Sequence, residues 1–282
     1  MTSERIDSHH HLWRYSSEEY GWISPEMQVL ARDFVLPDLE KVLPKAGVAG
    51  SVAVQARQTL QETEWLLSLA RDSEVVRGVV GWVPLTSERL PGVLESLRIH
   101  PKLKGLRHVV QDELDDAFMS RADFNRGIGT LTSAGLVYDI LIYPRHLPEA
   151  IDLVDRHPNQ VFVLDHMAKP LIREAKLDPW REHIVQLARR ENVYCKISGM
   201  VTEADWANWH VRDLRPYFDV VLQSFGPRRL MAGSDWPVCL LASGYDRWFQ
   251  TLEQFTTGLS ANEKDLIFGR VALGVYKLQG AR

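Results

Sequence analysis

The stretch Ile6-Asp7-Ser8-His9-His10-His11 decides the fold that we expect, because an apolar strand start runs directly into three imidazoles. Two later stretches have the same form, Leu164-Asp165-His166 and Gly233-Ser234-Asp235. In a (β/α)8 barrel the carboxyl ends of the parallel strands open into one shared mouth, where such enzymes keep their active sites. The pattern therefore predicts an α/β protein with a (β/α)8 TIM barrel, in which both ends of the chain contribute to one site.

Strand-like and helix-like segments alternate along the whole chain. The expected strands begin near Ile6, Ser51, Gly78, Gly105, Val137, Val161, Val193 and Leu230. This alternation is typical of a parallel sheet. A doubly wound sheet is the alternative, but the first strand lacks the glycine fingerprint of a nucleotide site. No linker or low-complexity tract divides the chain, so we expect residues 1–282 to form a single barrel domain.

Three helix starts are predicted from capping residues. Thr59-Leu60-Gln61-Glu62 and Ser260-Ala261-Asn262-Glu263 have the form of capping boxes. Asp178 precedes a proline and is the expected N-cap of a helix that runs to Arg190.

The bulk composition excludes several function classes. The chain is 45% hydrophobic, with a formal net charge of −4 and a pI near 6.2, which gives no basis for binding nucleic acid or an anionic membrane. No apolar run approaches the ~20 residues of a membrane span. The two cysteines, Cys195 and Cys239, have no paired spacing, and the chain starts without an apolar signal segment. These features favour a reducing cytoplasm.

The longest connection, residues 12–37, follows the first strand and is rich in aromatic side chains, including Trp13, Tyr20, Trp22 and Phe34. Loops of this length are usually functional or disordered, and the aromatic content argues against disorder. We interpret the segment as a wall or lid over the barrel mouth, with Trp22 as a substrate-binding residue. The alternative is an aromatic plug that makes no substrate contact.

Three histidines and one carboxylate are the candidates for chemistry. His9 and His11 are two residues apart on a strand, so both imidazoles point the same way, towards a metal or an oxyanion. Asp235 follows the last strand and is the candidate general base for water or a cation ligand, although it also fits a helix cap. His166 is the third candidate nitrogen ligand, or a donor to a carbonyl oxygen. His9, His11, His166 and Asp235 together have the composition of a single zinc site.

A charged residue lies within another of the predicted strands. Lys196 lies within an apolar strand, where a lysine is costly to bury unless a carboxylate pairs with it. A catalytic role and a structural salt bridge to Asp165 or Asp235 both satisfy that requirement.

Four further candidates for substrate binding end the second, third and fourth strands. They are Gln55, Trp82, Arg107 and His108. The arginine suits a carboxylate or several oxygens, whereas Trp82 fits structural packing almost as well.

With these residues in view, the chain resembles the sugar-lactonase branch of the amidohydrolase superfamily, the L-fuconolactonase- and L-rhamnonolactonase-like proteins. The resemblance runs from Ile6 to about Tyr276. Its markers are Ile6-Asp7-Ser8-His9-His10-His11-Leu12-Trp13, Val54-Gln55-Ala56, Val80-Gly81-Trp82, Gly105-Leu106-Arg107-His108, Asp165-His166-Met167-Ala168-Lys169-Pro170, Cys195-Lys196-Ile197-Ser198-Gly199 and Gly233-Ser234-Asp235-Trp236-Pro237.

The resemblance implies an amidohydrolase-like barrel that hydrolyses a lactone ester. In that pattern Asp235 is the base for water, while the three histidines hold a metal or the carbonyl oxygen. The chain departs from many amidohydrolases after the fourth strand, which offers Arg107-His108, and after the fifth, which ends Ile142-Tyr143-Pro144 with His146 beyond it. We therefore expect at most one zinc ion, not required for activity, because the lactonase branch includes members that work without metal.

The leading hypothesis is hydrolysis of an aldonolactone, such as L-fucono- or L-rhamnono-lactone, to the open acid. Asp235 would activate water, with His166 and Lys196 as further catalytic residues. The alternative is a metal-dependent decarboxylase of an aromatic or enol acid, in which Arg107 would face the carboxylate. A third reading is a barrel that binds a sugar acid without converting it. The sequence carries no signal for an oligomeric state.

Overall fold

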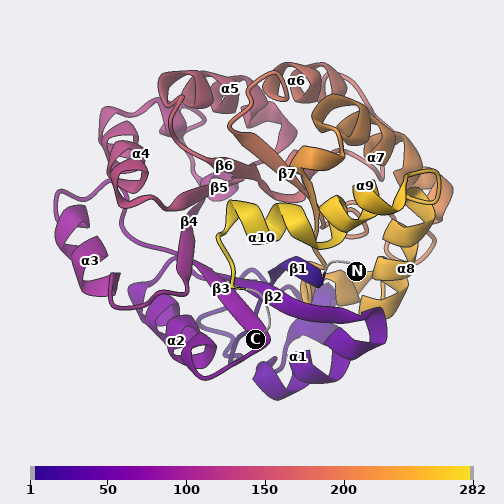
Figure 1. The fold of residues 1–282 in the computed structure, drawn as a ribbon, viewed down its shortest axis with the longest axis horizontal. Helices are drawn as coiled ribbons and strands as arrows, with labels where there is room; N and C mark the ends of the chain where they lie inside the picture. Colours follow the sequence, from indigo (N-terminus) through magenta and orange to yellow (C-terminus); the bar gives the residue numbers. More distant parts are fainter. Residues whose placement is uncertain (1–3, 280–282) are drawn as a thin grey trace.

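Eight parallel strands in chain order form one sheet in the computed structural model, which describes residues 4–279. Figure 1 shows them arranged as a barrel inside a ring of helices. The strands are β1 (Arg5–His10), β2 (Val48–Val54), β3 (Val76–Gly81), β4 (Leu103–Val109), β5 (Val137–Leu141), β6 (Phe162–Leu164), β7 (Val193–Ile197) and β8 (Leu230–Ala232). This architecture confirms the predicted (β/α)8 barrel.

Helices follow the strands in regular alternation. They are α1 (Leu36–Val42), α2 (Leu60–Arg71), α3 (Leu90–Leu97), α4 (Ala122–Ala134), α5 (Leu147–Arg156), α6 (Trp180–Leu187), α7 (Val211–Phe225), α8 (Tyr245–Phe255), α9 (Ala261–Asp265) and α10 (Val271–Val275). Short 3-10 segments include η1 (Pro25–Leu30), η6 (Asp165–Ala168) and η8 (Val238–Leu241). Within residues 4–279, no helix has the length and apolarity needed to cross a bilayer.

The strands β2, β3 and β4 begin two or three residues earlier than the sequence predicted, so Gly78 and Gly105, the expected first residues of β3 and β4, lie inside these strands. A Cβ atom at Gly78 would lie 2.8 Å from Leu278, and one at Gly105 would lie 2.9 Å from the Val137 carbonyl oxygen. These glycines therefore permit close packing within the barrel wall.

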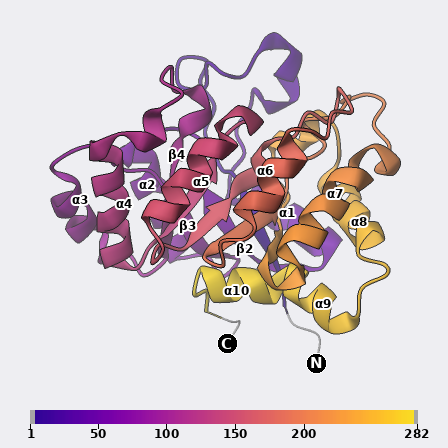
Figure 2. The same cartoon turned by 90° about the horizontal axis from the view of Figure 1, so that it is seen from above.

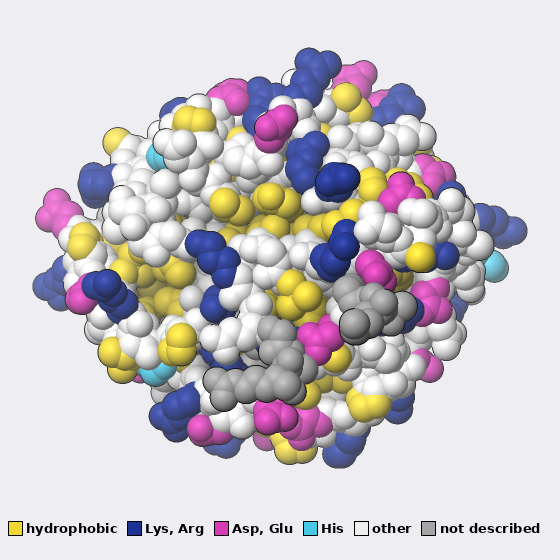
Figure 3. All heavy atoms as spheres, viewed as in Figure 1, with side chains coloured by type: hydrophobic (Ala, Val, Ile, Leu, Met, Phe, Trp, Pro, Cys, Tyr) yellow, Lys and Arg dark blue, Asp and Glu magenta, His cyan; other side chains and the backbone are white. Residues whose placement is uncertain are grey.

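An apolar cluster fills part of the barrel interior, and α10 closes the end opposite the mouth. The interior cluster consists of Ile6, Val52, Val54, Val80, Val137, Val163 and Met231, capped by Val271, Ala272, Tyr276 and Leu278. Figure 2 shows α10 on one side of the barrel and the indigo-to-purple segment around η1 on the other. Figure 3 shows the face closed by α10, where cationic and anionic side chains are interspersed rather than gathered by sign.

The seam between β1 and β8 is closed by the residues that follow β8. The Asp235 N–H donates to the His9 carbonyl at 2.8 Å, and the His11 N–H donates to the Trp236 carbonyl at 2.6 Å. The buried Asp7 carboxylate accepts from both the N–H (2.8 Å) and the Oγ (2.6 Å) of Ser234. These bonds fix the histidines of β1 against the turn that carries Asp235.

One of the predicted helix starts is wrong and another is half right. The Ser260 capping box is confirmed. Thr59 caps α2, but the Glu62 carboxylate accepts instead from the N–H groups of Ala56 (3.0 Å) and Arg57 (2.7 Å).

Asp178 is not an N-cap. Helix α6 begins at Trp180 without a side-chain cap and ends at Leu187 instead of Arg190. Both carboxylate oxygens of Asp178 accept from the Arg181 guanidinium, at 3.0 and 2.5 Å. This bidentate ion pair competes with capping for the same oxygens.

Most of the segment 12–37 is a packed aromatic plug, and only part of it forms a wall. Trp13 pairs with Phe34 through two backbone hydrogen bonds, and both side chains are fully buried. Tyr20 is also buried. Trp22 is the exception, because 43% of it is exposed and it reaches the mouth of the barrel.

Candidate active site

The histidines of β1 alternate in direction as predicted. His9 Nε2 and His11 Nε2 lie 3.2 Å apart at the mouth, whereas His10 turns to the other side and bonds the Ser51 hydroxyl at 3.0 Å. All three are buried. The strand pleat alone is enough to bring two imidazoles together here.

Asp235 lies at the point where three imidazoles converge. Its Oδ1 atom is 3.3 Å from His11 Nε2 and 3.8 Å from the Nε2 atoms of both His9 and His166. The residue has a left-handed backbone conformation, with a φ of 56°. That turn aims the carboxylate into the mouth, so the helix-cap alternative does not apply.

The hydrogen bonds of His11 fix its tautomer. Its Nδ1 lies 2.8 Å from the Val54 carbonyl oxygen, an acceptor, so the proton is on Nδ1 and the neutral ring presents a lone pair on Nε2. That lone pair faces a carboxylate oxygen 3.3 Å away. Two acceptors this close require a cation or a proton between them, which is the arrangement expected at a metal site.

Burial keeps the other two imidazoles neutral. Burial lowers the pKa of His166 to about 4, although the charges of Asp235 and Asp165 oppose the shift. Burial also places the pKa of His9 well below its usual value, with Lys196 and His166 adding to the effect. For Asp235, burial favours a higher pKa, but His166 and His11 outweigh it and hold the pKa below its usual value. Neutral imidazoles and an ionised carboxylate are the forms that bind a metal.

The spacing of these atoms fits one zinc ion. In a tetrahedral site with zinc ~2.0 to 2.1 Å from each ligand, neighbouring ligand atoms are ~3.3 Å apart. His9, His11 and Asp235 approach that spacing, at 3.2, 3.3 and 3.8 Å. His166, whose ring centre lies 4.4 Å from that of His9, is outside this group of three. A bound zinc would have three ligands from this chain and an open position, which is typical of a catalytic site.

Among residues 4–279, a second cation has no comparable place. Asp165 forms the other group with His9 and His166, but its oxygens already pair with the Lys196 ammonium (2.9 Å) and the Arg107 guanidinium (2.9 Å). A metal ion there would be repelled by both positive charges.

His166 lies on an unusual turn of the chain. Residues 166–169 all have φ between 51° and 59°, so they form a left-handed turn after β6. A non-glycine residue in this conformation costs ~1–2 kcal/mol. The Ser198 hydroxyl lies 2.8 Å from His166 Nδ1, and a Cβ at Gly199 would lie 2.7 Å from that atom. Glycine at position 199 therefore leaves space for the His166 imidazole.

Lys196 lies beneath the site and not in it. The side chain is fully buried, pairs with Asp139 and Asp165, and places Nζ 3.2 Å from His9 Nδ1. The predicted bridge to Asp165 exists, whereas the one to Asp235 does not. Lys196 does not line the cavity above Asp235, so its contact with the site runs through His9.

A cavity of about 350 Å³ lies above Asp235. It is lined by His11, Trp22, Met27, Ala56, Arg107, Val109, Gln111, Asp112, Leu141, Tyr143, His166, Lys169, Thr202, Glu203, Trp206, Asp235, Val238 and Leu241. The structure thus brings Trp22, Arg107 and the His11, His166 and Asp235 set to one cavity.

Three predicted substrate-binding residues do not line this cavity. Gln55 is fully buried. His108 pairs with Glu113 at 2.6 Å and stacks on Phe118 at 4.7 Å, and the Trp82 indole N–H donates to His108 Nδ1. Trp82 and His108 therefore make structural contacts in the barrel wall. Their position at strand ends was not enough to predict this.

Sequence reasoning also missed several wall residues. Lys169, Glu203, Tyr143 and Trp206 come from the loops after β5, β6 and β7, where no periodic pattern marks a side chain as facing inward. Lys169 was visible only as part of the stretch Asp165–Pro170.

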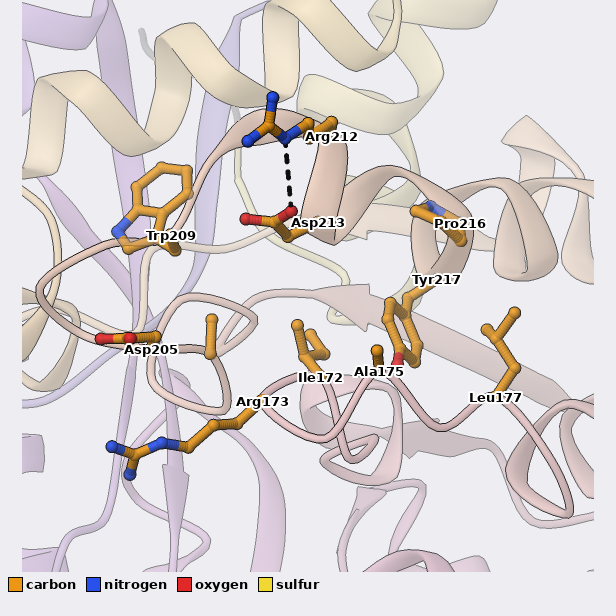
Figure 4. Close-up of a pocket in the computed structure, with 11 residues that line it drawn as sticks. Ile172, Arg173, Ala175, Leu177, Asp205, Trp209, Arg212, Asp213, Pro216 and Tyr217 are labelled. Carbon is orange, nitrogen blue, oxygen red and sulfur yellow. Dashed lines mark ion pairs between the residues drawn. The ribbon is translucent and has the colours of Figure 1, made fainter.

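A second cavity, of about 370 Å³, is lined by residues of the loops after β6 and β7 and of α7 (Figure 4). Trp209 and Tyr217 form its aromatic part, and Arg212 pairs with Asp213 at its rim. None of the predicted site residues lines it.

Replacing Trp22 with alanine is expected to change the relative kcat/KM values among lactones by about 3- to 10-fold, because Trp22 reaches the mouth while the plug residues around it are buried. Initial rates on five- and six-membered aldonolactones test this expectation. An equal loss on all lactones, accompanied by a lower melting temperature, would instead assign Trp22 to folding.

This chain belongs to the amidohydrolase family, whose model matches residues 6–278. It is 41% identical to an L-fucono-1,5-lactonase from Burkholderia multivorans, covering 99% of this chain and 97% of the relative. It is 35% identical to an L-fucono-1,5-lactonase from Burkholderia ambifaria, covering 97% and 96%. A crystal structure of an amidohydrolase from Burkholderia multivorans with bound zinc superposes with a TM-score of 0.96 at 41% identity, covering 98% of this chain and all of that one.

Proposed function

We propose that this protein hydrolyses a sugar-acid lactone to the open acid, with L-fucono-1,5-lactone as the first substrate to test. The observation that carries the proposal is the convergence of three imidazole Nε2 atoms on one Asp235 oxygen at the floor of a 350 Å³ cavity. The two lactonase relatives, at 41% and 35% identity over almost the whole chain, support the substrate class.

In this proposal Asp235 removes a proton from the water that attacks the ring carbonyl carbon. The carbonyl oxygen lies against His166, whose Nε2–H stabilises the negative charge that develops when the Ser198 hydroxyl donates to Nδ1. The proton then passes to the ring oxygen as the ester bond breaks, which gives the hydroxy acid. Lys196 and Asp165 contact His9 Nδ1 from beneath the site and fix the orientation of the imidazole.

Zinc fits the same residues. Held by His9, His11 and Asp235, it would polarise the carbonyl or acidify the attacking water. The bound zinc of the Burkholderia multivorans structure supports this assignment.

The decarboxylase alternative is not favoured. It requires a free Arg107 guanidinium facing the substrate carboxylate, but Nη1 donates to Asp165 at 2.9 Å and Nη2 donates to the Gln55 carbonyl. Two lactonase relatives also argue against it.

The direct test is acid release from a panel of five- and six-membered aldonolactones, followed with a pH indicator. We expect enzyme-dependent turnover with a preference for the L-fucono configuration. An absence of turnover on every lactone of the panel would reject the proposal.

Zinc occupancy gives a separate prediction. We expect at most one zinc ion per chain, and less than about a tenfold fall in kcat after chelation, because a lactone ester is reactive enough to need little electrophilic help. Elemental analysis and assays before and after chelation measure both. Two ions per chain would contradict the first expectation, and complete loss restored by stoichiometric zinc would contradict the second.

A further inference from the structure

Two oppositely charged side chains on the cavity wall lack an ion-pair or hydrogen-bond partner among the residues that the structure describes. Lys169 and Glu203 both line the cavity above Asp235, and both are half-buried. Within residues 4–279, neither side chain forms an ion pair or a hydrogen bond. By contrast, the Arg107 guanidinium in the same wall is paired with Asp165.

The backbone holds these two residues in place. Lys169 ends the left-handed turn that begins at His166, with a φ of 52°, and its Nζ lies 5.4 Å from the centre of the Tyr143 ring. Glu203 lies in the loop after β7, where its carbonyl accepts from the Arg173 N–H at 2.9 Å. That bond ties the loop carrying Glu203 to the loop that follows Lys169.

Both groups lie on the wall that also carries the reacting residues. Lys169 and Glu203 line the same cavity as His166 and Asp235, and Lys169 is three residues from His166 on one left-handed turn. Burial raises the pKa of Glu203, and the Lys169 ammonium opposes this shift.

An ammonium only donates hydrogen bonds and a carboxylate only accepts them, whereas a hydroxyl does both. A sugar hydroxyl between the two groups would accept from the Lys169 ammonium and donate to the Glu203 carboxylate. Buried polar groups that lack such a partner penalise a ligand that cannot supply it.

We propose that Lys169 and Glu203 form a hydroxyl clamp that receives the ring hydroxyl next to the lactone carbonyl, the one on C2. The clamp rests on the proposed function and deepens it. It makes Lys169 and Glu203 specificity-determining residues that favour polyhydroxy lactones over lactones that have no hydroxyl on C2.

The test compares an aldonolactone with its 2-deoxy analogue in four proteins: wild type, Lys169→Met, Glu203→Gln and the control Lys176→Met. Lys176 is an exposed lysine paired with Glu174 outside the cavity. We expect each clamp variant to lose about 10- to 100-fold in kcat/KM on the aldonolactone, and less than about threefold on the 2-deoxy analogue. The control should match wild type on both.

The outcomes separate the clamp from the function. If wild type turns over no lactone, the proposed function fails. If wild type turns over both substrates equally, or the variants lose equally on both, the function stands and the clamp is overturned. Glu203→Gln preserves the side-chain shape, so it carries the test even if Lys169→Met fails to fold. Lys169→Arg, which keeps a donor cation, should recover part of the lost preference.

Discussion

Replacing Asp235 with asparagine is expected to lower kcat for lactone hydrolysis by about 10³-fold. The amide has the shape of the carboxylate, and asparagine tolerates the left-handed backbone at this position, where φ is 56°. It cannot accept a proton from water, however, and a positioned general base contributes about 10²- to 10⁴-fold. Steady-state rates on the best lactone measure the effect.

The matched control is Asp219→Asn, which changes an exposed carboxylate paired with Arg215 on α7. It should leave kcat unchanged, and both variants should keep the wild-type melting temperature within a few degrees. If Asp235→Asn retains more than about a tenth of the wild-type kcat, Asp235 is not the base.

Replacing Lys196 with methionine is expected to destabilise the protein by about 3–5 kcal/mol. The change removes the cation between the fully buried carboxylates of Asp139 and Asp165, which leaves the Asp139 charge uncompensated and Asp165 paired only with Arg107. The midpoint of urea unfolding measures the loss.

The pH dependence of this loss is a second readout. Burial raises the pKa of Asp139 to about 6 even beside Lys196, so without the lysine the carboxyl takes up a proton on folding. An acid with a raised pKa in the folded state stabilises that state as the pH falls. The deficit of the variant should therefore shrink between about pH 8 and about pH 5. A deficit below about 1 kcal/mol, or one independent of pH, would contradict this account, and exposed Lys41→Met should show no deficit.

The chemistry at the strand ends was predictable because β structure has a strict period. A two-residue spacing fixes His9 and His11 on one side, and parallel strands carry their carboxyl ends to one mouth, which places Asp235 opposite them. These rules need only local spacing and the barrel topology.

What the sequence did not reveal depends on contacts between distant segments. Lys196 was expected to need a carboxylate, but its partner Asp139 is one of many acidic residues in the chain, and only the packed barrel selects it. Likewise, the left-handed turn at residues 166–169 contains no glycine, so the sequence did not predict the turn. Lys169, which the turn places on the cavity wall, was therefore not recognised as a cavity residue. Asp178 failed as a cap because an arginine three residues later competes for its oxygens.

The seam between the first and last strands determines when the candidate active site is complete. Asp7 and Ser234 are 227 residues apart, yet their hydrogen bonds seat the base against the histidines. A chain that lacks β8 carries the imidazoles but not Asp235, so the candidate active site is complete only when the last strand has closed the barrel.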